Sequence, residues 1–278
     1  MIYTILDMAT TAALLFIISS GLLIIFGVMG LINFSHGSFI AVGGYVAVVV
    51  ANLDMNPWWS IPLSFLVGGC LGVVTEQLIA RFLYHRPLDA ILATWGLGIV
   101  ITELIVVAFG RTVQFAGSPI SGAFEILGFP YSAYRLALIP AACVVGLVMF
   151  LVLNKTRLGL DTRAVISNSS LAEALGVNSA RVRLLMFAFG AGLATLSGAL
   201  MTPLASVTPN MGLPWLVSAF MLVLVSGNSL LALVMASVIL GSVQSLVSYY
   251  LSPVLGGVTL AFLGALLLRL RPQGFQLN

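Results

Sequence analysis

The chain has 278 residues, of which 60% are hydrophobic and only 7% are charged, and its mean hydropathy is +1.16. Soluble globular proteins carry about 25% charged residues, so this composition excludes a soluble domain and predicts an integral membrane protein. The net charge of +3 gives no support to nucleic-acid binding. The apolar runs are too long for barrel strands, which read as segments of about 10 residues with alternating polarity. We therefore expect an all-α fold, a polytopic bundle of membrane-spanning helices.

Nine apolar runs are candidates for spanning helices, because a helix needs about 20 mostly apolar residues to cross the hydrocarbon core. Two of the runs, 37–53 and 213–227, are short or adjoin breaks, so we expect eight or nine crossings that include broken helices. All of them are expected to form one transmembrane domain, residues 1–278. The runs are 8–30, 37–53, 60–80, 90–110, 136–154, 184–206, 213–227, 229–250 and 254–270.

The stretch INFSHGSFIAVGGY, from Ile32 to Tyr45, interrupts this apolar sequence with polar residues and glycines. Polar side chains at membrane depth usually face the bundle interior or a water-filled cavity, and irregular backbone there must be sheltered from lipid. We expect a broken helix beside a polar path, with Asn33, Ser35 and His36 offering groups to a passing solute. The alternative is structural: Asn33 and His36 cap helix ends, and the glycines after them only permit close packing.

Further polar residues lie inside the next two runs. Thr94, Trp95 and Glu103 are candidates for lining the same path, although Trp95 is as readily a packing residue and Glu103 a contact to another subunit. Glu76 stands near the end of its run, where we expect it to pair with Arg81.

The segment 155–183 is a long basic loop. Because basic loops remain on the cytoplasmic side, we expect it in the cytoplasm together with 81–89 and the C-terminal tail, and 111–135 on the outer side. Five of the chain's 11 basic residues lie in the loop, namely Lys155, Arg157, Arg163, Arg181 and Arg183.

Within this loop the sequence predicts two short helical pieces around a turn at Gly176. Leu171, Ala174 and Leu175 fall on one face at helical spacing. A short apolar face among charges suits the docking of a soluble partner, and the alternative is an ordinary solvated loop.

A second break follows the seventh run and resembles the first. In both 33–47 and 225–241, polar residues or glycines follow an apolar run and precede a helix rich in small residues. Paired breaks in two halves of a chain indicate the central site of a transporter. Ser226 and Asn228 are therefore further candidates for the path. The expected pseudo-repeat halves are about 1–130 and 135–278.

Catalytic and metal chemistry find little support. The P-loop pattern G-x-x-x-x-G-K-[ST] does not occur, so the chain is not expected to bind ATP through it. Two scattered histidines and two scattered cysteines make no convincing metal site. We expect no catalytic residue, no metal ligand and no cofactor bound by this chain.

Five motifs in a fixed order carry a resemblance to a known family. The chain resembles, over nearly its whole length, the permease subunits of bacterial ABC importers for branched-chain amino acids and related amides. The motifs are G-L-x-x-I-F-G-V-M-G-x-I-N-F-S-H-G from Gly21, R-x-L-Y-x-R-P-L from Arg81, T-R-L-G-x-x-x-R-A from Thr156, E-A-L-G-V-N-x-x-R-V from Glu173 and R-P-Q-G-F from Arg271.

The resemblance implies an importer of several chains in the bacterial inner membrane. Two homologous permeases, usually different, form the path, two cytoplasmic ATPases use ATP and Mg, a periplasmic protein delivers the solute, and membrane lipid surrounds the helices. Glu173, Ala174, Leu175 and Gly176 match the family's ATPase-coupling loop. In the same loop, Arg163 lies in a family motif, and Arg181 and Arg183 are expected to pair with acidic ATPase groups or lipid phosphate.

Two departures from the family pattern bear on the solute. Ser226-Gly227-Asn228-Ser229 stands where relatives usually have Gly-Gly-x-Gly, and Ser35 and Ser38 occupy the first break. The stretch LATWGLGI, from Leu92 to Ile99, looks more like the urea-type branch. Branched-chain or other neutral amino acids and urea or short amides are therefore both candidates, and a stand-alone carrier or channel is a remoter one.

Overall fold

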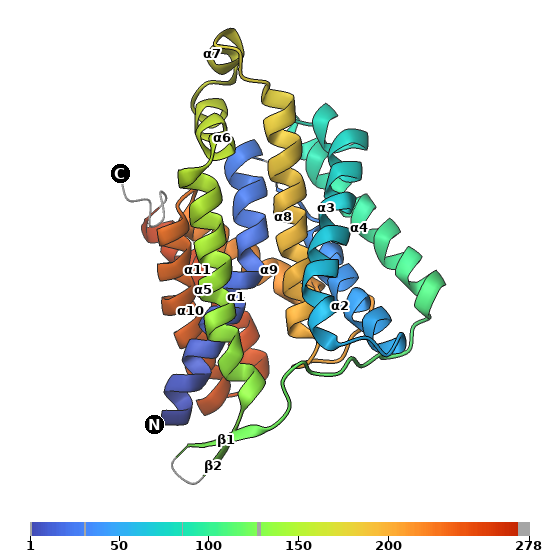
Figure 1. Cartoon of the computed structure of the whole chain (residues 1–278). Helices are drawn as coiled ribbons and strands as arrows, with labels where there is room; N and C mark the ends of the chain where they lie inside the picture. The colour runs from blue at the N-terminus through green and yellow to red at the C-terminus, as the bar shows by residue number, and fades with distance from the viewer. Residues whose placement is uncertain (1, 31, 85, 127–128, 272–278) are drawn as a thin grey trace.

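The computed structural model describes residues 2–30, 32–84, 86–126 and 129–271. These residues form a helical bundle with a small β-hairpin at one end (Figure 1). The α-helices are α1 (Ile2–Met29), α2 (His36–Asn52), α3 (Ser60–Leu78), α4 (Pro87–Phe109), α5 (Ala133–Lys155), α6 (Arg157–Ser167), α7 (Ser169–Ala174), α8 (Ser179–Met201), α9 (Leu213–Ser226), α10 (Leu230–Tyr250) and α11 (Pro253–Leu270). Two short 3₁₀ turns, η1 (Pro57–Trp59) and η2 (Ala80–Phe82), flank α3.

Each of the nine predicted runs coincides with one helix of the described chain, so the all-α polytopic fold is confirmed. Within the described residues, seven helical spans are long and apolar enough to cross a membrane. The two shorter apolar helices are α2 and α9, which have 17 and 14 residues. These two correspond to the two runs that the sequence marked as short.

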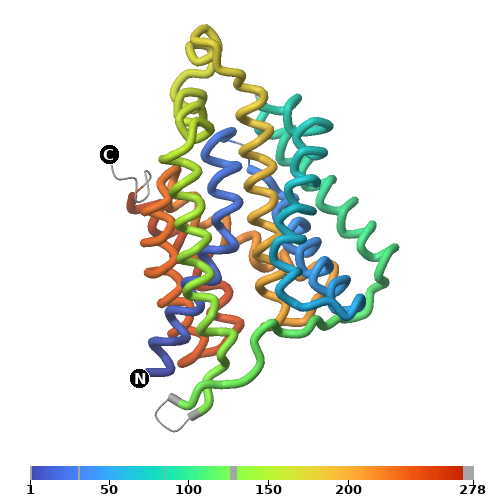
Figure 2. Tube along the Cα trace, viewed as in Figure 1, coloured from blue at the N-terminus to red at the C-terminus, as the bar shows by residue number. Residues whose placement is uncertain are grey.

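Helices α1 and α8 form the centre of the bundle. The most apolar windows of α1 and α8 are 72% and 78% buried, whereas those of α4, α5 and α11 are only 17–22% buried. Helices α2 and α3 pack on α8, and α9 and α10 pack on α1. The tube view shows this arrangement, with α4 at one side of the bundle (Figure 2). The sparsely buried helices are the ones available to lipid or to other subunits.

Small residues bring the central helices into backbone contact. A Cβ added to Gly21 would lie 2.3 Å from the carbonyl oxygen of Gly190, so α1 and α8 cross without side chains between them. A Cβ at Gly43 would lie 1.7 Å from the carbonyl oxygen of Thr195, where α2 crosses α8. Helices in lipid gain their contact energy from such close packing. The packing role expected for the glycines of the first break is confirmed at Gly43.

The two ends of the bundle differ in character. Figure 1 shows the N-terminus and the hairpin at one end and α7 at the other. The Arg183 guanidinium carbon lies 4.7 Å from the centre of the Tyr84 ring, so 81–89 and the basic loop share an end, as predicted. Residues 272–275 of the C-terminal R-P-Q-G-F motif lie outside the described residues.

The long segment 111–135 contains strands that the sequence analysis did not predict. Strands β1 (Ala123–Ile126) and β2 (Phe129–Ser132) pair antiparallel, with Phe124 opposite Tyr131. The segment also pairs Gln114 with Val207, which follows α8. This pairing gives hydrogen-bond partners to backbone N–H and C=O groups of the segment, which lie outside the helices. The hairpin lies at the end opposite α7, as expected for an outer loop.

Candidate functional site

The first break is held by its own polar residues. The Asn33 Oδ1 atom accepts hydrogen bonds from the Ser35 backbone amide at 3.0 Å and from the Ser35 hydroxyl at 2.6 Å. The backbone amide of Phe34 donates to the Thr94 hydroxyl at 3.1 Å, which ties the break to α4. Asn33, Ser35 and Thr94 are all at most 3% exposed. In this conformation they stabilise the break, and their contact with a solute remains a prediction.

His36 begins α2 and is fully enclosed. Its Nε2 atom lies 2.9 Å from the carbonyl oxygen of Ile18, in the middle of α1. Its Nδ1 atom is buried without a hydrogen-bond partner among the described residues. The imidazole therefore connects α2 to the central helix.

A cavity of about 400 Å³ lies beside the first break. Trp95 and Glu103 of α4 line it together with Phe34, whose ring packs edge-on against Trp95 at a centroid distance of 5.5 Å. The Glu103 carboxylate lies 3.9 Å from the Arg111 guanidinium, and both side chains are more than half exposed. Two predicted path residues, Trp95 and Glu103, thus face the same open space, whereas Asn33, Ser35, His36 and Thr94 are not among the residues that line it.

Glu76 has a different partner from the one predicted. Its carboxylate accepts a hydrogen bond from the Tyr84 hydroxyl, whereas the Arg81 guanidinium lies over the Phe82 ring. Burial and the bond to Glu76 raise the pKa of the Tyr84 phenol, so it remains protonated and able to donate. The expected Glu76–Arg81 pair is therefore wrong. The turn η2 directs Arg81 outward, and Tyr84 satisfies the buried carboxylate instead.

The second break presents one polar residue to a separate small cavity. Ser226 is buried, and its hydroxyl donates to the Val223 carbonyl at 3.1 Å within α9. Asn228 is exposed and lines a cavity of about 190 Å³ together with Arg163 and Asn154. The structure thus places a predicted path residue beside a predicted coupling residue, at the end of the bundle that carries α7.

The basic loop forms two short helices, α6 and α7, but both lie before the turn at Gly176 and not on either side of it as predicted. The long helix α8 begins at Ser179, directly after the turn. Leu171 and Leu175 are 58% and 77% exposed, and Glu173 and Ala174 are exposed as well, whereas Ala172 is buried. The predicted apolar face is therefore present on α7, at the tip of the molecule (Figure 1). We call Leu171, Glu173, Ala174 and Leu175 the α7 tip.

Gly176 makes the turn that projects the α7 tip. Its φ of +91° lies in the left-handed region that favours glycine. Its backbone amide donates to the Glu173 carbonyl at 2.9 Å. Asn178 then caps α8, since its side chain accepts from the Arg181 amide at 2.9 Å. The loop is thus a defined, hydrogen-bonded projection.

The arginines of this loop have distinct surroundings. Arg163 is exposed and donates to the carbonyl of Leu153 at the end of α5. Arg181 lies exposed in the first turn of α8. Arg183 is half-buried over the Tyr84 ring. Arg163 and Arg183 therefore join the loop to the spanning helices, and Arg181 faces outward.

Among the described residues, no group of three or more histidine, cysteine or acidic side chains is arranged to hold a metal ion.

A second cavity, which was not predicted from the sequence, lies beside Asp7 and Arg135 at the hairpin end of the bundle. Their positions are 128 residues apart, so no local pattern could have paired them.

The geometry of broken helices and a projecting loop agrees with a family comparison. Residues 4–270 match the family model described as "Branched-chain amino acid transport system / permease component". The chain belongs to this permease family. The permease is accordingly a multi-pass inner-membrane protein and a transport subunit of an ABC importer.

Two relatives illustrate the family. The permease is 28% identical over 251 residues to the "Probable branched-chain amino acid transport permease protein LivH" of Methanocaldococcus jannaschii, with 87% of this chain and 80% of the relative covered. It is 26% identical to the LivH protein of Salmonella typhimurium, with 93% and 89% covered.

A sugar permease is also similar. The "Ribose import permease protein RbsC" of Haemophilus influenzae is 25% identical, with 77% of this chain and 66% of the relative covered. The solved structure described as "PsaBC from Streptococcus pneumoniae in complex with Fab" has a TM-score of 0.52 at 14% identity and covers 96% of this chain and 91% of that chain. That likeness shows the fold alone.

Proposed function

We propose that this permease forms half of the translocation path of an ATP-driven importer for branched-chain or other neutral amino acids. Its expected partners are a second homologous permease, two cytoplasmic ATPases and an extracytoplasmic solute-binding protein. The relatives named for branched-chain amino acid transport support the solute class. ATP and Mg belong to the ATPases in this assignment.

The α7 tip is the single observation that carries the ATP-driven mechanism. Leu171 and Leu175 stand exposed at the extreme end of the bundle, beside the basic residues that mark its cytoplasmic side. Leu171 and Leu175 project beyond the spanning helices, so the helices do not cover these two side chains. Large apolar side chains clustered on a projecting surface are typical of a protein contact. Docked ATPases would move this tip as they close on ATP.

The path is proposed to open when the helices around the first break move. Asn33, Ser35, His36, Thr94 and Ser226 are buried in this conformation, whereas Trp95, Glu103 and Asn228 already face cavities. The buried Nδ1 atom of His36 has no partner among the described residues, which leaves it a polar contact to gain in another conformation. Weak, transient contacts suit a permease, because a tight site would slow release.

The relatives that transport ribose make a sugar the second candidate solute. Urea or a short amide remains a further candidate from the LATWGLGI stretch. A sugar or amide offers hydroxyl or amide groups without a charge pair, whereas an amino acid needs both signs of charge in its path.

The test is uptake by the complete importer in vesicles, with ATP enclosed on the ATPase side. Labelled L-leucine should accumulate only with ATP, and an excess of unlabelled valine should compete, whereas ribose and urea should not. If only ribose or urea competes, that compound is the solute and the amino-acid assignment is wrong. Accumulation without ATP or ATPases would indicate a stand-alone carrier.

A further inference from the structure

A polar cavity of about 410 Å³ opens at the end of the bundle opposite α7. It lies between α1, α5 and α10, with the end of α8 and the start of α9 completing its lining. Small-molecule sites typically occupy about 300–1,000 Å³. The volume is therefore sufficient for a solute of amino-acid size.

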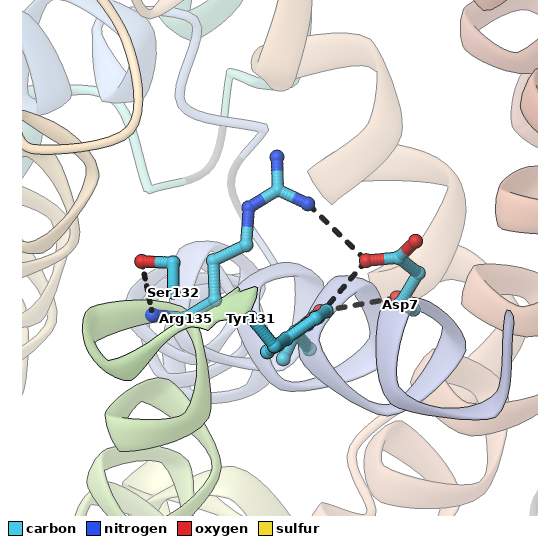
Figure 3. A network of polar contacts seen from close by, with 5 residues as sticks. Asp7, Tyr131, Ser132 and Arg135 are labelled. Carbon is cyan, nitrogen blue, oxygen red and sulfur yellow. Dashed lines mark hydrogen bonds and ion pairs between the residues drawn. The ribbon is translucent and has the colours of Figure 1, made fainter. Parts of the chain in front are cut away.

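The mouth of this cavity holds two opposite charges (Figure 3). The Arg135 Nη1 atom lies 3.2 Å from the Asp7 Oδ1 atom, and the two side chains point toward one another. The Tyr131 hydroxyl donates to the same Asp7 oxygen at 2.9 Å and lies 3.3 Å from the Thr10 hydroxyl. The carboxylate is thus fixed in place, while the Asp7 and Arg135 side chains remain 36% and 50% exposed.

The other outer carboxylate–arginine pair is less organised. Glu103 and Arg111 lie 3.9 Å apart, with side-chain exposures of 58% and 79%, and no hydrogen bond from the described residues fixes either group. Exposed ion pairs of this kind contribute little. Of these two pairs, only Asp7–Arg135 is held in position by a further hydrogen bond among the described residues, from Tyr131.

The lining of the cavity changes from charged to apolar with depth. Along α1 it passes from Asp7 through Thr10 to Leu14, and along α5 from Arg135 to Leu138. At a rise of 1.5 Å per residue, Leu14 lies about 10 Å along α1 from Asp7. Leu14 and Leu138 are 9% and 1% exposed. A ligand with charged groups at one end and an aliphatic group at the other matches this gradient.

One further polar group of the lining has no partner. The Gln244 Oε1 atom on α10 is buried and accepts no hydrogen bond among the described residues. A buried acceptor that receives no hydrogen bond is unfavourable. A turn of the Gln244 side chain into the cavity would let this oxygen accept a hydrogen bond from a ligand ammonium.

We propose that this cavity is a binding site for a zwitterionic α-amino acid with an aliphatic side chain. The ligand carboxylate would pair with Arg135, its ammonium with Asp7 and Gln244, and its side chain would reach toward Leu14 and Leu138. Binding replaces one ion pair by two charge-assisted contacts, which are among the stronger hydrogen bonds in proteins. The inference rests on the proposed function, because it assigns the residues that bind the charged groups of the imported solute.

The experiment measures protection of a cysteine placed in the cavity. Thr11→Cys is introduced after Cys70→Ala and Cys143→Ala, and the variant is purified with its partner permease and ATPases but without the binding protein. A maleimide probe is added with L-leucine, with isoamylamine or with 4-methylpentanoate. At about twice its Kd, a ligand slows labelling roughly threefold, because only the free fraction reacts. L-Leucine should protect, and the two compounds that lack one charge should protect much less.

Variants of two ion pairs provide the matched controls. Arg135→Gln should abolish protection by L-leucine, and Arg135→Lys should restore part of it because the charge is kept. Asp89→Asn, in the exposed Arg86–Asp89 pair at the opposite end of the bundle, should leave protection unchanged. The size-exclusion profile of each complex reports whether a variant has lost its fold.

Three results would overturn the site: no protection by L-leucine, equal protection by all three compounds, or protection that survives Arg135→Gln in a folded complex. If the intact importer still takes up L-leucine with ATP, such a result removes the site and leaves the proposed function. If uptake itself is absent, the proposed function has failed.

Discussion

At the residue scale, the buried polar groups of this permease act mainly by holding the backbone. Asn33 and Thr94 bond to the broken segment, and Tyr84 bonds to the buried carboxylate of Glu76. Sequence reasoning identified Asn33, Thr94 and Glu76 as unusual. It could not show which way their side chains turn, because that depends on helices distant in the chain.

Tyr84→Phe removes the donor to a carboxylate that is 4% exposed. A buried charged group that loses a hydrogen bond costs about 1–3 kcal/mol or more, so the apparent melting temperature in detergent should fall. Tyr250→Phe is the control, since Tyr250 is 72% exposed, and it should leave the melting temperature unchanged. Equal melting temperatures for the two variants would show that the Tyr84 bond contributes nothing.

Thr94→Val removes the acceptor of the Phe34 amide while keeping the shape of the side chain. The unpaired amide should destabilise the first break by about 1–3 kcal/mol, and ATP-driven uptake should fall with it. Thr94→Ser keeps the hydroxyl and should retain both stability and uptake. The prediction fails if the Thr94→Val and Thr94→Ser variants have the same thermal stability and the same rate of uptake.

At the element scale, the bundle depends on helix crossings that only glycine permits. The position and length of each apolar run predicted its helix to within six residues at either end, because chain-local hydrophobicity decides where a helix can lie in lipid. The hairpin was not predicted, because its pairing partners are short and carry no alternating pattern. The Asp7–Arg135 cavity was not predicted either, because it forms between distant helices.

Gly43→Ala tests the crossing of α2 and α8. The added Cβ would fall 1.7 Å from the Thr195 oxygen, so the helices must separate. Overpacking of this kind costs about 1–3 kcal/mol, and folded protein recovered from membranes should decrease.

Gly96→Ala is the matched control on α4, where an added Cβ meets nothing within 4 Å. It should be neutral or stabilising by up to about 1 kcal/mol. Recovery of Gly43→Ala equal to that of Gly96→Ala would contradict the packing account.

At the scale of the whole molecule, the two ends of the bundle carry different features. One end carries the hairpin and the Asp7–Arg135 cavity, and the opposite end carries the α7 tip, the Glu76–Tyr84 bond and Arg183. Arg183 packs on Tyr84, which gives the proposed motion of the α7 tip a route of contact to α3 and α8. The motifs of the sequence predicted the family and the tip, whereas this route needed the folded chain.

The most direct measurement is recovery of partner chains with the tagged permease from its native membrane in mild detergent, with mass spectrometry of the purified material. The account predicts that two ATPase subunits and a second permease accompany the wild-type chain. With Leu175→Asp, which places a charge on a side chain that is 77% exposed, the second permease should remain and the ATPases should be lost. Recovery of the chain alone under the gentlest extraction, or ATPases retained in full by Leu175→Asp, would contradict the central claim that docked ATPases drive this permease through α7.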